Sequence, residues 1–189
     1  MSAQDSKLFV ISGPSGAGKG TLVTRVRERR SNLGLTVSAT TRAPRKGEVD
    51  GVNYFFLTRE EFDRRVANGE FVEWAEVHGN CYGTLVSEVQ SKLASGASLI
   101  LEIDVQGALQ VKERFPEAVL IFIKPPSLVV LRERLVGRGT ETPETIELRM
   151  ANAAHELALA DRYDDVVVND DLDRATDELV RVLDMHERI

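Results

Sequence analysis

Short runs of apolar residues alternate with amphipathic stretches over most of the chain. The runs fall at residues 8–11, 98–104, 118–123 and 164–169, and near-continuous hydrophobicity of this kind is typical of strands buried on both faces. Helical spacing of apolar positions starts at Thr21 and recurs over residues 86–93, 106–114, 128–135, 144–160 and 172–186. Repeated strand–helix units predict an α/β fold of three layers, a parallel sheet with helices on both sides.

Residues 35–84 interrupt this alternation with a block that is richer in short strands. β-Branched, aromatic and other apolar residues predict strands over 35–41, 54–57 and 71–78. Residues 80–84 are predicted to form a turn with a following segment. The block therefore predicts a small mixed α+β domain inserted into the α/β core.

One helix is predicted inside this block. It runs from Arg59 to Asn68, with Thr58 at its entry and two acidic residues, Glu60 and Glu61, in its first turn. Gly69 follows at the position where a helix commonly ends.

The loop after the first strand carries a phosphate-binding pattern. Gly13 and Gly18 stand at the spacing of the motif G-x-x-x-x-G-K, and Lys19 completes it. Glycines let backbone N–H groups approach a polyphosphate, the following helix start carries partial positive charge, and Lys19 adds a full charge. A glycine-rich turn without a ligand is the alternative, but strand, loop, lysine and helix occur here in succession. The pattern predicts a nucleoside triphosphate site.

The motif departs from its usual form at one position. A Ser or Thr commonly follows the lysine and places its hydroxyl on Mg²⁺, whereas this chain has Gly20 and then Thr21. The order Gly-Lys-Gly-Thr resembles the phosphate loop of adenylate kinases, so a nucleotide site is still expected. Thr21 or water is the expected substitute, with Mg²⁺ held mainly by the nucleotide phosphates and water.

Composition narrows the class of protein. The 189 residues fit one globular unit with small inserts, and a net charge of −6 argues against a dedicated nucleic-acid or membrane-surface binder. The lone Cys81 cannot form an internal disulfide, which suits a reducing compartment. No signal-peptide pattern or membrane-spanning run is present, so we expect a cytoplasmic protein.

Basic and phenolic residues cluster in the inserted block and near a glycine-rich segment at 137–143. Arg42 and Arg45 lie three apart on a loop broken by Gly and Pro, a spacing that suits a fork around a phosphate group. A solvated surface role is the alternative for any single arginine. The set consists of Arg42, Arg45, Tyr54, Tyr82, Arg138 and Arg149.

Three carboxylates form a second group. Glu73 lies on the strand predicted over 71–78, where period-2 alternation places Phe71, Glu73, Ala75 and Val77 on one face. Glu102 and Asp104 end a buried strand, and three interpretations remain open: a cap for the following helix, an acid that organises Mg²⁺, or base recognition. Guanine presents N1–H and N2–H₂ side by side, which one carboxylate can accept, whereas adenine has no such pair.

Taken together, these motifs resemble guanylate kinases, the P-loop kinases of nucleoside monophosphates, from about Leu8 to the last helix. The resemblance implies transfer of the γ-phosphoryl group of ATP to GMP, and to dGMP, in purine nucleotide metabolism. The motifs that carry it are Gly13–Lys19, Ser38–Glu48, Gly51–Tyr54, Glu70–Ala75, Tyr82–Thr84, Glu102–Gly107, Gly137–Thr142 and Val168–Asn169.

The same resemblance implies a role for each matching residue. Catalysis would fall to Lys19, Arg42, Arg138 and Arg149. ATP would be bound by Gly13, Pro14, Ser15, Gly16, Ala17, Gly18, Lys19, Gly20, Thr21, Arg134 and Asn169. GMP would be bound by Ser38, Arg42, Arg45, Tyr54, Glu73, Tyr82, Thr84, Glu102 and Asp104, with Thr84 replacing a serine common at that place.

The resemblance also implies a division into three parts. The core would comprise residues 1–34, 91–126 and 158–189, the GMP-binding domain 35–90 and a helical lid 127–157. Closure of the last two parts over the core would exclude water, with Gly137 and Gly139 as hinge residues. A monomer or small homo-oligomer is expected.

Three other functions are weighed against this one. A non-catalytic guanylate-kinase-like binding module is disfavoured by the complete phosphate loop and the lid arginines. An adenylate-type kinase is favoured only by Gly20 and Thr21, and a switch GTPase lacks its Asn-Lys-x-Asp segment. The three histidines, His78, His155 and His186, form no i, i+4 metal pair.

Overall fold

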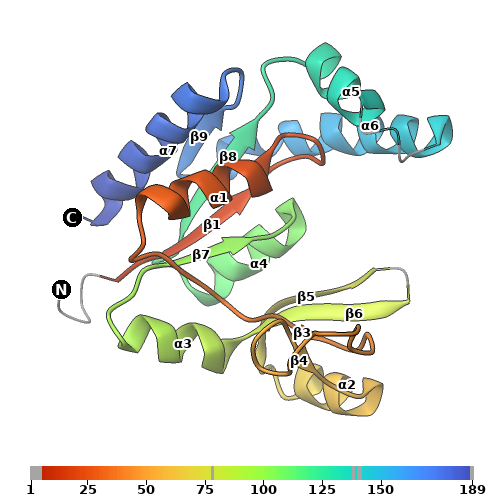
Figure 1. Ribbon diagram of the computed structural model, residues 1–189, viewed down its shortest axis with the longest axis vertical. Coiled ribbons are helices and arrows are strands. Elements are labelled where there is room, and N and C mark those ends of the chain that lie inside the picture. Colours follow the sequence, from red (N-terminus) through yellow and green to blue (C-terminus); the bar gives the residue numbers. More distant parts are fainter. Residues whose placement is uncertain (1–5, 78, 138, 140–141, 188–189) are drawn as a thin grey trace.

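The chain forms two separate sheets with helices packed around them (Figure 1). The computed structural model describes residues 6–77, 79–137, 139 and 142–187. The larger sheet lies in the middle of the molecule, the smaller one lies beside α2 (Arg59–Ala67), and a pair of helices projects at the opposite end (Figure 1). None of the helices in the described ranges is long and apolar enough to cross a membrane.

The larger sheet has five parallel strands in the order β2-β7-β1-β8-β9. This confirms the predicted α/β class and the positions of the strands expected from the apolar runs, but the expected burial on both faces is wrong for β9, an edge strand that exposes Val166 and Val168. Their bounds are β1 Leu8–Ser12, β2 Gly34–Leu35, β7 Leu99–Glu102, β8 Val119–Lys124 and β9 Asp165–Val168.

Helices cover both faces of this sheet, which explains why its strands are apolar without alternation. Phe9 and Ile11 pack in the cluster that includes α1 (Lys19–Arg29) and α7 (Leu172–Glu187). Leu8 and Val10 pack on the other face with α3 (Val86–Ala94) and α4 (Val105–Arg114). All of β1 is buried as a result.

The smaller sheet has four strands in the order β4-β3-β6-β5, with one parallel and two antiparallel pairings. The helix α2 packs on it through Phe62, whose ring stacks on Phe71 at 4.3 Å between centroids. As predicted, Thr58 caps α2, accepting the Glu61 N–H at 3.1 Å. The strands are β3 Ala39–Thr40, β4 Phe55–Phe56, β5 Phe71–Val77 and β6 Asn80–Leu85.

Two predicted elements of the inserted block are wrong. The single strand expected over 35–41 is divided between the sheets, because Leu35 pairs with β7 and Ala39 pairs with β4 and β6. The turn expected at 80–84 is the strand β6, whose turn-forming composition is overridden by pairing with β5. Gly83 suits this close pairing, since a Cβ there would lie 2.7 Å from the Glu73 carbonyl oxygen.

The expected alternation along β5 is also wrong at its start. The pairing with β6 shifts register between Phe71 and Glu73, as at a β-bulge. Phe71 packs against α2, whereas Val72 belongs to the core cluster that includes α4. The shift therefore separates Phe71 from the face on which Glu73 lies.

The chain enters and leaves the smaller sheet at neighbouring points. The Val37 N–H donates to Glu88 Oε1 of α3 at 3.1 Å, and Lys92 Nζ of α3 donates to the Leu35 carbonyl at 2.7 Å. The incoming segment is thus tied to the helix that follows the outgoing strand β6. The boundaries of the predicted domains stay predictions, and Val89 of α3 packs with the core cluster.

The helices α5 (Leu128–Gly137) and α6 (Pro143–Leu157) pack on each other through their own small cluster. Ser127 Oγ accepts the Val130 N–H at the start of α5, and Thr142 caps α6. The cluster contains Leu131, Leu135, Ile146 and Ala153.

Candidate functional site

The phosphate loop joins the carboxyl end of β1 to the start of α1. Gly13 and Gly18 adopt φ values of 140° and 91°, which glycine tolerates and other residues rarely adopt. No side chain caps α1 at Gly18, so its first N–H groups lie at an end suited to bind an anion. The loop therefore has the geometry that its sequence predicted for a polyphosphate cradle.

Lys19 lies folded over this loop. Its Nζ donates to the carbonyl oxygens of Gly13 at 2.6 Å and Pro14 at 3.2 Å. Burial raises the pKa of the Glu156 carboxyl on α6, and the positive charge of Lys19 acts in the opposite direction. Lys19 therefore lies between the loop that it is predicted to serve and an acidic group that the sequence did not single out.

Gly13 also allows a close approach of two strand ends. A Cβ at residue 13 would lie 2.3 Å from the carbonyl oxygen of Ile123 in β8. Gly13→Ala is expected to lower the free energy of unfolding by roughly 2–4 kcal/mol, because a backbone clash adds to the unfavourable φ. Urea denaturation measures the change. Gly79→Ala is the matched control, since Gly79 has a φ of 78° and no atom within 4 Å of a built Cβ. Equal losses in both variants would contradict the role of the close approach.

Asn169, after β9, holds the loop in place. Its Nδ2 donates to the Ala17 carbonyl at 2.8 Å, and its own carbonyl accepts from Arg134 Nη2 of α5 at 2.8 Å. The side chain lies close to Gly18, where a Cβ would be 2.4 Å from Nδ2. The structure thus places both residues beside the loop, and their predicted contact with ATP stays a prediction.

The helix α6 brings one predicted lid arginine to the loop. The guanidinium of Arg149 donates to Ser15 Oγ. Arg138 lies outside the described residues, so its predicted role has no structural account here. The contact links a candidate catalytic side chain to the candidate ATP site directly.

A cavity of about 460 Å³ lies between α1, β7 and the smaller sheet. It opens beside the phosphate loop, because Gly20 is one of the residues that line it. Four residues predicted to bind GMP also line it: Ser38, Tyr54, Thr84 and Glu102. The fold therefore brings part of the predicted ATP site and part of the predicted GMP site to one cavity.

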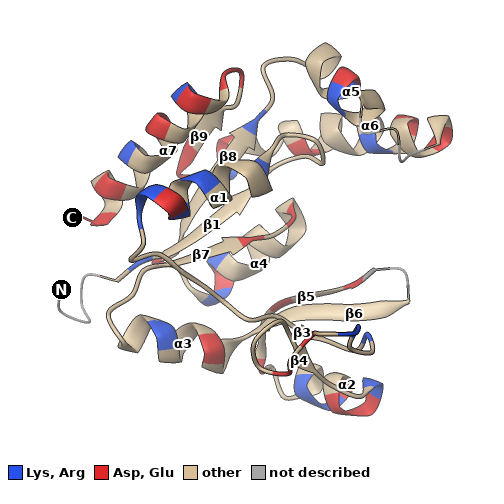
Figure 2. Ribbon diagram, viewed as in Figure 1, with Lys and Arg blue, Asp and Glu red and all other residues tan. Residues whose placement is uncertain are grey.

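Arg42, Tyr54 and Tyr82 form a basic cluster on the smaller sheet. The Arg42 guanidinium carbon lies 5.4 Å from the centre of the Tyr54 ring, and the rings of Tyr54 and Tyr82 meet edge to face at 6.2 Å. Arg45 lies exposed on the same loop. Figure 2 shows Lys and Arg gathered in this loop after β3, whereas both signs of charge mix along α7. The guanidinium and hydroxyl groups of this basic cluster are donors suited to bind a phosphate group.

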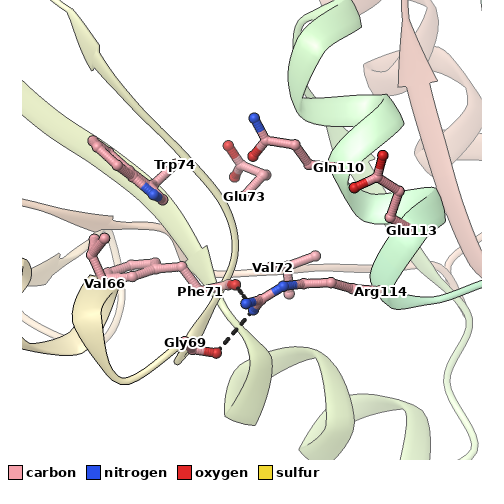
Figure 3. A pocket seen from close by; sticks show the side chains of 9 residues that line it. All are labelled: Val66, Gly69, Phe71, Val72, Glu73, Trp74, Gln110, Glu113 and Arg114. Atoms are coloured by element: carbon pink, nitrogen blue, oxygen red, sulfur yellow. Dashed lines mark hydrogen bonds between the residues drawn. The ribbon is translucent and has the colours of Figure 1, made fainter.

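Glu73 faces α4 across a second, smaller cavity of about 150 Å³. Figure 3 shows its carboxylate opposite Gln110 of α4. Thr84 Oγ1 donates to Glu73 Oε1 at 2.8 Å. Burial raises the pKa of Glu73, the Thr84 hydroxyl opposes the shift, and the negative charge of Asp104 adds to it. Glu73 and Thr84 are thus in direct contact, as their shared predicted role requires.

Asp104 caps α4, which confirms the capping interpretation for Asp104. Its Oδ1 accepts the Gly107 N–H at 2.7 Å. Gly107 keeps this corner open, since a Cβ there would lie 3.4 Å from Asp104 Oδ1 and 3.6 Å from Glu73 Oε2. The cap and the carboxylate of Glu73 therefore meet at the start of α4, and contact of either with a base stays a prediction.

Glu102 lies beside Gly20 at the end of β7. A Cβ on Gly20 would be 3.5 Å from Glu102 Oε1, and the carboxylate is exposed toward the cavity. Within the described ranges, no three His, Cys, Asp or Glu side chains form a group that could hold a metal ion. Glu102 beside Gly20 fits a Mg²⁺ ion that is carried by the nucleotide phosphates and bound by the Glu102 carboxylate either directly or through a water molecule.

Two further residues of this region were missed by reasoning from sequence. Glu48 accepts hydrogen bonds from Arg42 Nη2 at 2.8 and 3.0 Å, and no role had been predicted for it. Tyr163 lies buried against Phe122, and burial raises its pKa to about 12. An acid close after two loop arginines was a usable signal for Glu48, whereas no local pattern marked Tyr163.

Comparisons with known proteins give a consistent result. The family model described as guanylate kinase matches residues 5–186. A guanylate kinase of Halalkalibacterium halodurans is 52% identical over 183 residues, which cover 97% of this chain and 90% of that protein. One of Gloeobacter violaceus is 56% identical over 178 residues, covering 94% and 87%.

A solved structure agrees with these relatives. The crystal structure of guanylate kinase from Anaplasma phagocytophilum superposes with a TM-score of 0.72 at 36% identity, covering 96% of this chain and 86% of that one. Both the family match and the identities extend over nearly the whole chain, including the phosphate loop and both sheets. The chain belongs to the guanylate kinase family.

Proposed function

We propose that the chain transfers the γ-phosphoryl group of ATP to GMP, giving ADP and GDP, with dGMP as a second acceptor. Its membership of the guanylate kinase family supports the reaction. The observation that carries the placement of substrates is the 460 Å³ cavity, which Gly20 of the phosphate loop lines together with Thr84 of β6. A donor held by the loop and an acceptor held by the smaller sheet would meet there.

On the ATP side, the loop N–H groups and the start of α1 would bind the β- and γ-phosphates. Lys19 would leave the carbonyls of Gly13 and Pro14 and place its charge on the transferring group. Asn169 and Arg134 would hold the loop from the side where we expect the adenine. Mg²⁺ would supply further neutralisation of phosphate charge when bound with ATP, next to Glu102.

On the GMP side, base and phosphate would lie at different places. Glu73 would accept the N1–H and N2–H₂ donors of guanine, supported by the Thr84 hydroxyl. Ser38 and Asp104 would complete the surroundings of the base. The phosphate would bind at the basic cluster together with Arg45, where the Arg42 guanidinium lies over the Tyr54 ring beside Tyr82.

The chemistry requires alignment more than it requires a general base. The attacking atom is a phosphate oxygen, and a phosphate monoester has a second pKa near 6, so it is already an anion at neutral pH. Rate enhancement then depends on in-line positioning and on cations around the transferring group. Lys19, Arg42 and Arg149 are the described residues proposed for this, and Arg138 is proposed from sequence. Movement of α5 and α6 toward the cavity would exclude water.

A coupled assay with separate acceptors tests the proposal. ADP formation from ATP and Mg²⁺ is measured with GMP, dGMP, AMP, CMP and UMP in turn. Fast turnover with GMP and dGMP is expected, with at least about a hundredfold lower kcat/KM for AMP, because adenine lacks the paired donors. Preference for AMP would support an adenylate-type kinase, and GMP binding without turnover would support a binding module. The cytoplasmic location and the monomer or small homo-oligomer stay predictions.

A further inference from the structure

An internal carboxylate binds the arginine that we assign to the GMP phosphate. Glu48 Oε1 and Oε2 accept from Arg42 Nη2 at 2.8 and 3.0 Å, and Oε2 also accepts the Arg45 N–H at 2.7 Å. Only 16% of the Arg42 side chain and 19% of the Glu48 side chain are exposed. The pair is therefore a partly buried, doubly hydrogen-bonded contact, unlike a surface ion pair of long, mobile side chains.

The guanidinium of Arg42 is held from several directions at once. Nη1 donates to the Ala43 carbonyl at 2.8 Å, and the group lies over the rings of Tyr54 at 5.4 Å and Phe56 at 5.9 Å. Glu48 and the Ala43 carbonyl together fix the group within the plane of its fork, and Glu48 is the charged member of this pair. The rings alone would fix its height above the sheet and leave its rotation open.

This arrangement leaves room for a phosphate. A guanidinium carries five N–H donors, and Glu48 is bound through Nη2 alone. Even with Nη1 bonded to the Ala43 carbonyl, the two partners do not use all five N–H donors, so a phosphate would bind the remaining donors while Glu48 stays in place. Hydrogen bonds from Arg42 and from the Arg45 N–H hold the pKa of Glu48 below its usual value, so the anchor stays ionised at neutral pH.

We propose that Glu48 is a positioning residue for the acceptor nucleotide: it fixes the Arg42 guanidinium over Tyr54 in the orientation that receives the GMP phosphate. The proposal rests on the function proposed above, in which Arg42 binds that phosphate. The alternative is that the Glu48 carboxylate repels the incoming phosphate dianion, in which case its removal would lower KM for GMP. The two possibilities differ in sign, and one measurement separates them.

Glu48→Ala is expected to raise KM for GMP about tenfold, the loss typical of a charged hydrogen bond, while KM for ATP and kcat change less than about twofold. Glu48→Gln keeps an acceptor oxygen for Arg42 and is expected to recover about half of the logarithmic loss. Glu60→Ala is the matched control for charge, because Glu60 is an exposed acid on α2. Melting temperatures confirm that each variant is folded. If Glu48→Ala does not fold, Glu48→Gln alone still shows whether KM for GMP rises or falls.

An unchanged KM for GMP in folded Glu48→Ala and Glu48→Gln would overturn the proposal, and a lowered KM would show repulsion instead. A double-mutant cycle separates this failure from failure of the proposed function. If Glu48 acts through Arg42, Glu48→Ala adds less than about twofold in an Arg42→Ala background. If Arg42→Ala itself leaves KM for GMP unchanged, the assignment of Arg42 to the phosphate fails first.

Discussion

Lys19→Met is expected to lower kcat by about three orders of magnitude, with little change in the folded structure. Lys19 is the only charged residue in the loop from Gly13 to Gly20, and removing one cation from a developing phosphoryl charge commonly costs this much. Methionine has similar length and no charge, so it preserves packing and removes the electrostatic interaction. Initial rates at saturating ATP and GMP measure the effect.

Lys7→Met is the matched control for the lysine substitution. Lys7 directly precedes β1, whereas Lys19 follows the loop at the other end of that strand. The control should keep kcat within about twofold, since its charge lies away from the proposed phosphates. A kcat of Lys19→Met near that of the unmodified chain would exclude the role given to this cation.

Glu73→Gln is expected to raise KM for GMP by about 10- to 100-fold. An amide can present an N–H₂ group to the guanine donors, and one charged hydrogen bond contributes roughly 1.5–3 kcal/mol. KM for ATP should stay unchanged, because Glu73 lies on β5 of the smaller sheet, whereas the phosphate loop joins β1 to α1 in the core. Glu113→Gln is the matched control, since Glu113 belongs to α4 and lines the same 150 Å³ cavity. Unchanged GMP kinetics in Glu73→Gln would remove Glu73 from base recognition.

The pH dependence of GMP binding gives an independent test of the same residue. Burial raises the pKa of Glu73, so its ionised form is lost at a higher pH than for an ordinary glutamate. KM for GMP should therefore rise as the pH falls through this raised pKa, and the rise should be smaller in Glu73→Gln, in which titration of the GMP phosphate remains. If both proteins lose affinity in parallel on acidification, another group is responsible.

Reasoning from sequence succeeded where the information is local. The strands β1, β7, β8 and β9 follow from continuous apolar runs, although β9 at the sheet edge exposes Val166 and Val168, and the phosphate loop follows from glycine and lysine spacing. The cap of α2 at Thr58 depends on contacts within four residues. In each case, the signal and the structure that it specifies lie in the same short segment.

It failed where distant segments decide the outcome. The strand β6 forms because β5 pairs with it, although Asn80 and Gly83 favour turns. The division of residues 35–41 depends on two different sheets, and the register shift before Glu73 depends on the partner strand. The contact between Glu48 and Arg42 spans only six residues, so a local signal for it was present and was not used.

The paired crossings between the two sheets have a mechanical consequence. The closure expected from the sequence would turn the smaller sheet about the point where the Val37 N–H is hydrogen-bonded to Glu88, and it would require the contacts of Arg114 of α4 with Gly69 and Phe71 to shift. Displacement in such a swing grows with distance from the axis. Ser38 and Thr84 adjoin the crossings and would barely move, whereas Arg42 would travel further. The guanine base would then stay close to the axis, while the phosphate of GMP moves toward ATP.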